Sequence, residues 1–463
     1  MRNEKEYRPY HPHQVFLLPP SPDDWLPEDH LAYFVSELVD SLDLSAIEAP
    51  YEDELRGAPP YHPAMMVKIL MYAYCKGVYS SRRIATHVQE DVAFRVLAAG
   101  NAPDFRTINA FRLRHLATLS GLFGQVLELA QQAGLVSMAH VALDGTKLEA
   151  NASKHKAMSY AYLQKEEERL KALVAEMFRR ADEIDAAEDA LYGPDKRGDE
   201  LPEELRTRAG RLARIRAAKA ALEAEAKEKA AAARAAQEAK AAEAAAEGRP
   251  PRAGKPPRET PADRAQYNFT DPESRIMKDA DGAFIQGYNA QLAVDAAHQI
   301  IVAADVTAQA ADAPHLAPMT TAILENTRQT PQRLSADAGY FSEDGLNAVV
   351  TAEIDPYIAT QRQKHSDPPS AAPRGRIPQG LPAKARMERK LRTQAGRAVY
   401  TMRKAIVEPV FGQIKGARGF VRFLLRGQVK VRGEWALVTT AHNIHRLFAA
   451  RRRVEPVLAQ AMR

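Results

Sequence analysis

The chain has 463 residues, of which 45% are hydrophobic, so it is long enough for two or three domains that each bury a core. No apolar run approaches the roughly 18 residues that suggest a membrane-spanning helix, and the charged N-terminus lacks the apolar segment of a signal peptide. The single cysteine, Cys75, excludes an intramolecular disulfide and fits a reducing cytoplasm. Its apolar, helical surroundings favour a buried structural thiol over a nucleophile.

The net charge is only +5, but its distribution along the chain is uneven. Arg and Lys crowd residues 374–432 and recur at 446–453, with few acidic residues in the first of these segments. A basic C-terminal third favours a polyanionic partner, because phosphate neutralisation releases counterions. A merely solvated basic surface remains an alternative.

Residues 1–135 are predicted to form an all-α N-terminal domain, because apolar residues recur there at helical spacing. Two polar breaks in this region, at 80–81 and 103–104, could cap the helices that follow them. Basic side chains come after the breaks: Arg82, Arg83, Arg106 and Arg112. Two basic helices after capped turns are typical of helix-turn-helix DNA-binding domains. A helical bundle with solvated arginines is the alternative.

Residues 156–265 have a different character and are predicted to be an inserted antiparallel coiled-coil hairpin with a Pro-rich linker. Leucine and other apolar residues recur every seven positions from Leu163, stop at the Gly/Pro turn at 193–198, and resume from Leu205. Beyond Leu222 the segment is almost purely Ala, Glu, Lys and Arg, which favours an exposed helical extension. The hairpin could dimerise, contact DNA or stiffen the insertion, and an intramolecular helix pair is the interpretation we favour.

The segments on both sides of this insertion predict one α/β domain, made of residues 136–155 and 266–448 and followed by a basic tail at 449–463. An apolar run that begins at Val141 and ends in Asp144-Gly145 predicts a buried strand before the insertion, and two strands around a turn at 297–298 follow it. Further strands are expected at 333–336 and 356–360, with helices between them, and residues 366–385 are expected to form a loop.

Three acidic residues differ from the many surface ones. Asp144 and Asp337 each end an apolar strand, and Glu408 lies in an apolar helical stretch. Ionised carboxylates in such surroundings are costly unless they are paired or metal-bound, and a cluster of three suits hard Mg²⁺ or Mn²⁺. Separate capping or salt bridging by each acid is the alternative.

The chain resembles the DDE transposases of bacterial insertion sequences in three motifs that occur in the family's order. They are Val-Ala-Leu-Asp-Gly-Thr-Lys at 141–147, Ser-Ala-Asp-Ala-Gly-Tyr at 335–340, and the series Tyr400, Arg403, Glu408 and Lys415. The similarity also covers the helical N-terminal region and the block at 426–443. The resemblance implies a ribonuclease H-like core, with Asp144, Asp337 and Glu408 as catalytic and metal-binding residues.

The same resemblance implies that Tyr400, Arg403 and Lys415 grip DNA near the scissile phosphate. Four residues separate Arg403 from Glu408, where the family commonly has three, and Lys404 stands at the three-residue spacing. The identity of the basic residue in the phosphate-contacting role, Arg403 or Lys404, therefore stays open.

The resemblance further implies a two-metal-ion reaction with Mg²⁺ or Mn²⁺. Water cleaves the element's end and leaves a 3′-hydroxyl, which then attacks a target phosphodiester without a covalent enzyme intermediate. The expected partners are double-stranded DNA, as terminal inverted repeats and as target, and a second copy of the chain in a homodimer on DNA.

Two other functions remain open for this sequence. One is a ribonuclease H-like nuclease or resolvase that cuts without joining, and the other is a non-catalytic coiled-coil DNA-binding protein. A further pair, Asp312 and His315, could approach the metal site, but a helix N-terminal cap by Asp312 is the simpler expectation.

Overall fold

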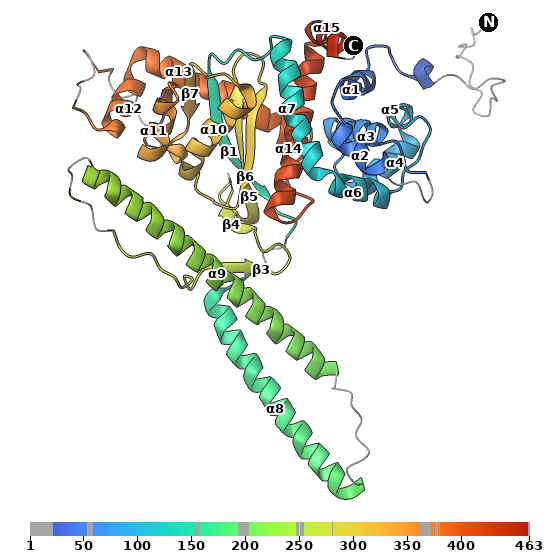
Figure 1. Ribbon diagram of the computed structural model, residues 1–463, viewed down its shortest axis with the longest axis vertical. Helices are drawn as coiled ribbons and strands as arrows, with labels where there is room; N and C mark the ends of the chain where they lie inside the picture. The colour runs from blue at the N-terminus through green and yellow to red at the C-terminus, as the bar shows by residue number, and fades with distance from the viewer. Residues whose placement is uncertain are drawn as a thin grey trace, which may run out of the picture.

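The structure is a computed structural model, and it describes residues 22–52, 59–152, 157–192, 203–246, 250, 254–279, 281–361, 372, 373, 375, 378 and 380–461. A group of short helices, a sheet with its helices, and a long helical hairpin that projects from the sheet are visible in Figure 1. The hairpin prolongs the molecule well beyond the sheet, while the short helices lie on the opposite side of α7 and α14 from it.

The N-terminal region is mostly helical, as the apolar spacing predicts. The α-helices of its described residues are α1 (Leu31–Asp40), α2 (Ser45–Glu52), α3 (Pro63–Cys75), α4 (Ser81–Glu90), α5 (Val92–Leu97), α6 (Phe105–Arg114) and α7 (Leu116–Gln132). Asp104 caps α6 by accepting a hydrogen bond from the Thr107 amide at 2.7 Å, which satisfies one of the free N–H groups of the first turn. Ser80 precedes α4 without a side-chain capping bond.

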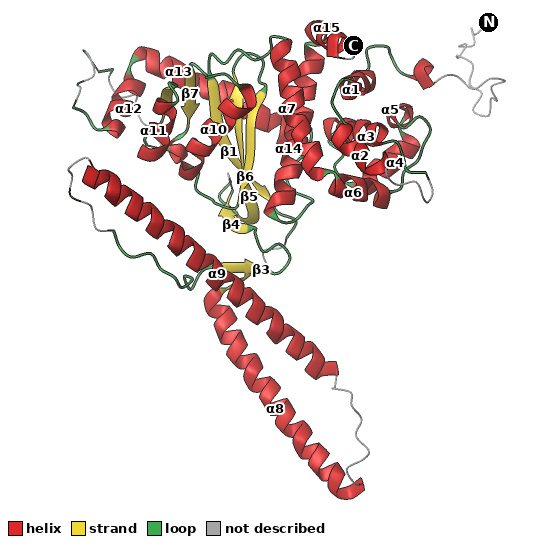
Figure 2. Cartoon of the chain, in the orientation of Figure 1, coloured by secondary structure: helices red, strands yellow, loops and turns green. Residues whose placement is uncertain are grey.

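A mixed sheet follows this helical region. Its strands are β1 (Val141–Glu149), β4 (Arg275–Lys278), β5 (Phe284–Asp295), β6 (Ile301–Thr307), β7 (Arg333–Ala336) and β8 (Asp355–Ile358). The order is β4-β5-β1-β7-β8, and β6 pairs with the other half of the long strand β5 (Figure 2). β1 is antiparallel to β5 but parallel to β7, which is parallel to β8. This mixed topology is compatible with a ribonuclease H-like core.

The helices that follow these strands along the chain connect the sheet to the rest of the molecule. They are α10 (Leu316–Thr327), α11 (Glu343–Thr351), α12 (Ala383–Arg392), α13 (Gln394–Gly412), α14 (Gln428–Ala449) and α15 (Arg451–Ala461), with a π-helical turn, η5 (Gln413–Ala417), after α13. α13 contacts β1, β5, β7 and β8, and α14 contacts β6, α3 and α7. Half of the predicted loop at 366–385 lies outside the described residues, and α12 begins before that predicted loop ends.

The insertion consists of two long helices, α8 (Tyr160–Tyr192) and α9 (Glu203–Ala246), which run in opposite directions (Figure 1). Leu163 and Leu170 are buried against Leu212, Ile215 and Leu222, so the predicted seam is apolar near the base of the hairpin. The seam from Met177 to Leu191 lies outside the residues whose side chains are described. A short antiparallel pair, β2 (Ala157–Ser159) and β3 (Gln266–Asn268), joins the two ends of the insertion.

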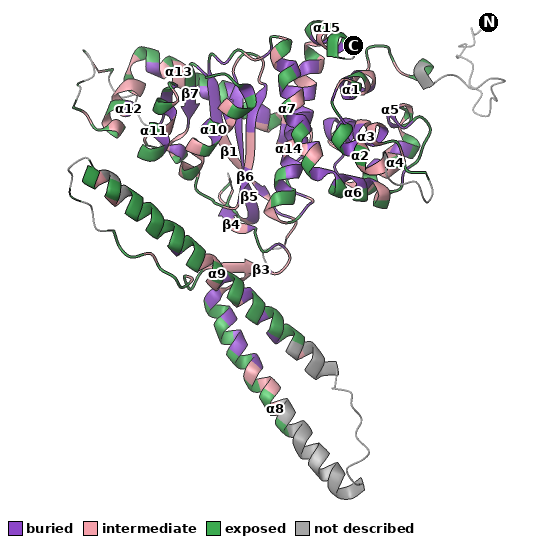
Figure 3. Cartoon of the chain, viewed as in Figure 1, coloured by how far each residue is buried: buried purple, intermediate pink, exposed green. Residues whose placement is uncertain are grey.

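One continuous core links the short N-terminal helices to the sheet and to α13 and α14, whereas the hairpin buries a separate small cluster. In Figure 3 the sheet and α14 are largely buried, and α9 beyond the base is largely exposed. Cys75 is buried, as predicted, and burial raises the pKa of its thiol to about 12. Among the described helices, none has the length and apolar character needed to cross a membrane.

Candidate active site

Asp144 and Asp337 lie side by side at one place in the sheet. The parallel register of β1 and β7 pairs Leu143 with Ala336, so the two aspartates occupy the next position on each strand. Asp144 is still within β1, and Asp337 begins the short 3₁₀ turn η4 (Ala338–Tyr340), where its carboxylate accepts a hydrogen bond from the Gly339 amide at 2.9 Å. The structure therefore brings together two acids that are far apart in the sequence.

The surroundings of Asp144 raise the pKa of its carboxyl group above the ordinary value. Burial raises its pKa to about 6; the Arg403 guanidinium opposes that rise, whereas the Asp337 charge adds to it. The Gly145 amide also donates to Asp144 Oδ1, at 2.9 Å. Mutual repulsion between two partly buried carboxylates is relieved by a bound cation, so this pair is suited to one.

Arg403 comes to this pair from α13. Its Nη1 donates to Asp144 Oδ2 at 2.7 Å, and its side chain is only 8% exposed. Tyr400, one turn earlier on the helix, lies beneath the guanidinium, 5.8 Å from Arg403 Cζ to the ring centroid. Lys404 is exposed on the same helix. Of the two basic residues left open by the sequence, Arg403 is therefore the one at Asp144.

Lys415 approaches the same part of β1 from the turn after α13. Its Nζ donates to Thr146 Oγ1 at 3.2 Å. Thr146 is two residues beyond Asp144, and residues two apart on a strand point to the same face of the sheet. Arg403 and Lys415 thus place two positive charges along the face that carries Asp144.

Glu408 is not brought into contact with the two aspartates. Its side chain is exposed on α13, five residues after Arg403 and therefore about 140° around the helix from it. Within the described part of the chain, no three His, Cys, Asp or Glu side chains are grouped so that they could hold one metal ion. The structure thus assembles two of the three predicted acids.

Asp312, which the sequence predicted to cap a helix N-terminus, lies next to this pair. Asp312 Oδ1 accepts hydrogen bonds from Lys147 Nζ at 3.0 Å, Asn289 Nδ2 at 2.6 Å and Gln291 Nε2 at 3.1 Å. It precedes the 3₁₀ turn η3 (Ala313–His315) but makes no side-chain capping bond there, so the capping expectation is wrong. Its three partners come from strands β1 and β5, and no local sequence pattern shows them.

Gly339 allows Asp312 and Asp337 to approach each other. A Cβ atom at this position would lie 3.1 Å from Asp337 Oδ1 and 3.2 Å from Asp312 Oδ2. Nearby, the buried Tyr340 hydroxyl donates to Gln291, one of the partners of Asp312. Asp312 thus belongs to a hydrogen-bonded group that borders Asp337. His315 lies at the end of η3, and burial lowers the pKa of its imidazole.

The predicted basic residues of the N-terminal region fall into two groups. Arg82 and Arg106 are exposed and lie over the same ring, that of Phe105, at 5.1 and 5.5 Å, and Arg83 is exposed beside Arg82. Arg112 is placed differently from the prediction, because it is only 3% exposed. Its guanidinium donates to Tyr79 O at 2.8 Å and to Asn109 Oδ1 at 2.9 Å, so these hydrogen bonds hold the side chain in the interior.

The aspartate pair fits a hard divalent cation. Both Asp144 and Asp337 offer carboxylate oxygens, which Mg²⁺ and Mn²⁺ prefer, and burial of the pair favours a counter-charge. Arg403 supplies that counter-charge to Asp144 Oδ2 in this structure, and among the residues that the structure describes, Asp144 Oδ1 accepts only the Gly145 backbone amide.

Two family models match the chain. One, described as a transposase domain (DUF772), matches residues 20–114, and the other, described as a transposase DDE domain, matches residues 258–444. Together they cover more than half of the chain, and the second includes Asp337, Arg403 and Glu408. Asp144 lies before the second match, on the far side of the hairpin insertion. No curated protein and no solved structure matches the chain.

Proposed function

The chain belongs to the DDE transposases, and on that premise we propose that it cleaves DNA at the ends of an insertion sequence and joins those ends to target DNA. The observation that carries the proposal is the adjacency of Asp144 and Asp337 at neighbouring positions of parallel strands β1 and β7. Members of this family act on nucleic acid and typically use a divalent metal.

The proposed reaction has two steps, hydrolysis at the element's end and transfer of that end to target DNA. In the first, a water oxygen bonds to the phosphorus at the element's end, and the bond from phosphorus to the 3′-oxygen breaks, which leaves a 3′-hydroxyl and a 5′-phosphate. In the second, the oxygen of that 3′-hydroxyl bonds to a target phosphorus in line, and a target 3′-oxygen leaves with a proton. Neither step needs a covalent enzyme intermediate.

We assign the metal-holding role to Asp144, Asp337 and Glu408, with two Mg²⁺ or Mn²⁺ ions. When bound, such cations lower the pKa of water and stabilise the charge on the leaving oxygen. Asp144 and Asp337 are already adjacent, and Glu408 is carried on the helix that delivers Arg403 to Asp144. Because Glu408 lies about 140° around α13 from Arg403, its entry into the site requires a rearrangement of α13 when DNA and metal bind.

The basic residues around the pair are proposed to bind the DNA backbone. Arg403 and Lys415 flank Asp144, and Lys404 is exposed on the same helix. Tyr400 supports Arg403 through its ring. In residues 1–135, which we propose as a DNA-binding domain, the exposed Arg82, Arg83 and Arg106 are the candidate contacts. Arg112 is left out of this set because it is buried.

The proposal also covers the architecture of the chain. We assign a ribonuclease H-like core to residues 136–155 and 266–448 and an antiparallel coiled coil to the hairpin of 156–265, with a basic tail at 449–463. Cross-helix ion pairs support the coiled coil, because Arg211 contacts Glu166 at 3.0 Å and Arg216 contacts Glu167 at 3.2 Å. Joining two element ends requires two active sites, so a homodimer on DNA is proposed.

A strand-transfer assay tests this function. The full chain is incubated with Mg²⁺, a supercoiled plasmid and labelled duplexes that carry the inverted repeats flanking the reading frame. We expect labelled ends joined to the plasmid, with no product when EDTA is present. Nicked or cut DNA without joined product would favour the nuclease alternative, and no Mg²⁺-dependent product of either kind would refute the proposal.

A further inference from the structure

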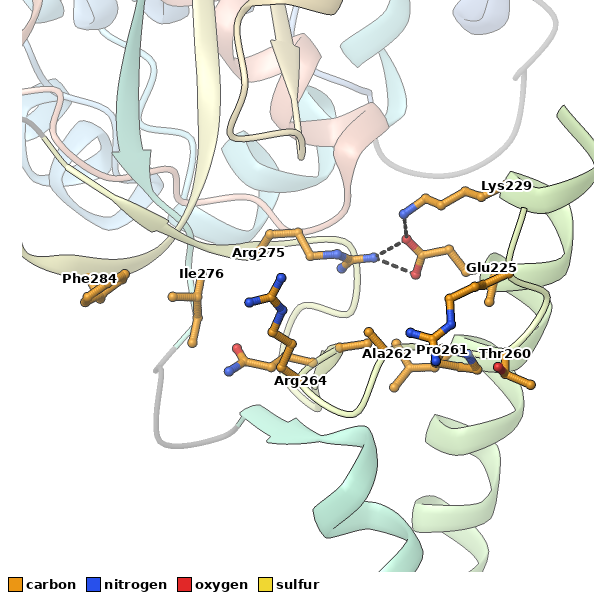
Figure 4. Close-up of a pocket in the computed structure, with 14 residues that line it drawn as sticks. Glu225, Lys229, Thr260, Pro261, Ala262, Arg264, Arg275, Ile276 and Phe284 are labelled. Carbon is orange, nitrogen blue, oxygen red and sulfur yellow. Dashed lines mark hydrogen bonds and ion pairs between the residues drawn. The ribbon is translucent and has the colours of Figure 1, made fainter. Parts of the chain in front are cut away.

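A hollow at the base of the hairpin lies away from the aspartate pair. It is an open depression of about 700 Å³ between α9, the segment at 258–266 and strands β4 and β5. Figure 4 shows Arg264, Arg275 and Lys229 around it, with Phe284 and Ile276 at one side. No motif in the sequence points to this site, because its lining comes from the insertion, the linker and the sheet.

The lining of the hollow carries a strong excess of positive charge. Four basic side chains line it, Lys229, Arg258, Arg264 and Arg275, against a single carboxylate, Glu225. Glu225 is already engaged, because it accepts two hydrogen bonds from Arg275 Nη2 and one from Lys229 Nζ. Arg258 and Arg264 are exposed and make no ion pair with any residue that the structure describes. Their charges are therefore available to an anionic partner.

Basic side chains also lie between the aspartate pair and the hollow, but on both faces of β1, because Glu149 is an odd number of residues from Asp144 and points to the opposite face. Lys415 contacts Thr146, Arg422 Nε donates to Glu149 at 2.6 Å, and Arg426 Nε donates to Asn151 O at 2.9 Å. Glu149 pairs with Gly287 of β5, and Gly287 in turn pairs with Arg275 of β4. From strand rise and spacing, Arg275 lies roughly 20 Å from Asp144.

That distance and that charge match a DNA backbone. Successive phosphates of one strand are about 3.4 Å apart along the duplex axis, so the hollow would meet phosphates about six base pairs from the one at Asp144. A small anion would need one cationic pocket, not further arginines and lysines between it and the aspartate pair.

We propose that the hairpin base, through Arg258 and Arg264, binds the phosphate backbone of double-stranded DNA that flanks the cleaved bond. The inference rests on the proposed function for the identity of that DNA as the element's end. The hairpin thereby extends the DNA-binding surface past the sheet, and its base acts as a second anchor that fixes the direction of the duplex across Asp144 and Asp337.

The experiment measures how DNA binding by the full chain depends on salt. A fluorescein-labelled duplex of arbitrary sequence is titrated with protein at several KCl concentrations, with anisotropy as the signal. Each phosphate contact contributes about 0.9 to the slope of log K against log salt, so Arg258→Gln/Arg264→Gln should lower that slope by about 2. Both side chains are exposed, so the variant should fold, and Arg258→Lys/Arg264→Lys should restore the slope.

Arg328→Gln/Arg333→Gln is the matched control, because it removes two exposed charges near the start of β7, at the end of the sheet away from Glu149 and the hairpin base. The control should keep most of the wild-type slope. An unchanged slope in the Arg258/Arg264 variant, or an equal loss in the control, would overturn the proposal. Binding of poly-glutamate in place of the duplex would also overturn it.

These results separate the inference from the proposed function, because binding needs no cleavage. A chain that shows the slope difference but no Mg²⁺-dependent product refutes the proposed function and keeps the DNA-binding surface. A chain that transfers strands but shows no slope difference refutes the surface alone.

Discussion

Nη1 of Arg403 lies 2.7 Å from Oδ2 of Asp144, so a helix residue and a strand residue 259 positions apart in the chain share a partly buried ion pair. The pair joins α13 to β1 at the place where Asp337 also ends its strand. Arg403 keeps the pKa of Asp144 from rising further, which keeps the carboxylate available to a cation near neutral pH.

Replacement of Arg403 by glutamine should destabilise the fold. Asp144 would lose a charge-assisted hydrogen bond while it remains partly buried, and such bonds are worth about 1.5–3 kcal/mol. The loss is measured as the free energy of unfolding in urea. Lys404→Gln is the matched control, since it removes the same charge from an exposed position and should change stability by less than about 0.5 kcal/mol. Equal effects of the two substitutions would contradict this role of Arg403.

Asp144→Asn and Asp337→Asn should each abolish Mg²⁺-dependent cleavage and leave DNA binding near that of the wild type. An amide is a poorer ligand for a hard cation than a carboxylate, and each substitution removes one of two adjacent ligands. Cleavage is measured on a labelled duplex, and binding by anisotropy with EDTA present. Glu325→Gln, an exposed acid on α10, serves as the control and should cleave normally. Full cleavage by either aspartate variant would refute the assignment.

Glu408→Gln should also abolish cleavage, although this side chain is exposed and not in contact with Asp144 or Asp337. We expect no change in the free energy of unfolding, because an exposed carboxylate without a close partner contributes little to stability. The two measurements together identify a residue that acts only when metal and DNA are bound. Unimpaired cleavage by this variant would remove Glu408 from the site and leave a two-aspartate centre.

Asp312→Ala should lower stability by about 2 kcal/mol, because Lys147, whose side chain is 16% exposed, would keep its charge without a partner. The double variant Lys147→Met/Asp312→Ala should recover part of that loss, since it removes both charges. Thermal and urea unfolding of the four proteins gives the coupling between the two residues. A double variant that loses the sum of the two single losses would show that the pair is not coupled.

Glu434 gives a pH-dependent prediction that involves no metal. It is completely buried in α14, where it accepts hydrogen bonds from the Leu424 and Leu425 amides, and burial raises its pKa to about 7. A raised pKa in the folded state contributes stability below the ordinary value near 4.5, and that stability is lost as the pH rises through 7.

Glu434→Gln keeps an acceptor oxygen for these amides but cannot ionise. Between pH 4.5 and 7 the wild type should therefore lose about 3 kcal/mol of unfolding free energy relative to this variant. Urea unfolding of both proteins across this range measures the difference. Parallel pH profiles for the two proteins would show that Glu434 does not titrate in that range.

Sequence patterns predicted most of the secondary structure because each element's pattern is local. The strand at 333–336 and the helix at 316–327 have the predicted bounds, and β5 begins three residues before the predicted start at Gly287. The apolar run before Asp337 also predicted that this acid closes a strand, whereas the same prediction for Asp144 is wrong, because β1 continues for five residues to Glu149. The adjacency of the two acids could be inferred only once the parallel pairing of β1 with β7 was known.

The parts that the sequence did not predict depend on contacts between distant segments. Asp312 has the local pattern of a helix cap, but its partners Asn289 and Gln291 lie on a neighbouring strand. Arg112 follows a capped turn as a DNA-binding residue would, yet packing of α6 against Tyr74 and Tyr79 buries it. The hollow at the hairpin base draws its charges from three separate segments.

The short strand pair β2–β3 has a consequence for how the chain finds its fold. More than one hundred residues separate Glu149 at the end of β1 from Phe284 at the start of β5, yet these two strands must pair. Closing a flexible loop of that length carries an entropy penalty that grows with the logarithm of its length. When α8 packs against α9 and β2 pairs with β3, the two ends of the insertion lie side by side. The entropy penalty for pairing β1 with β5 is then that of a short loop.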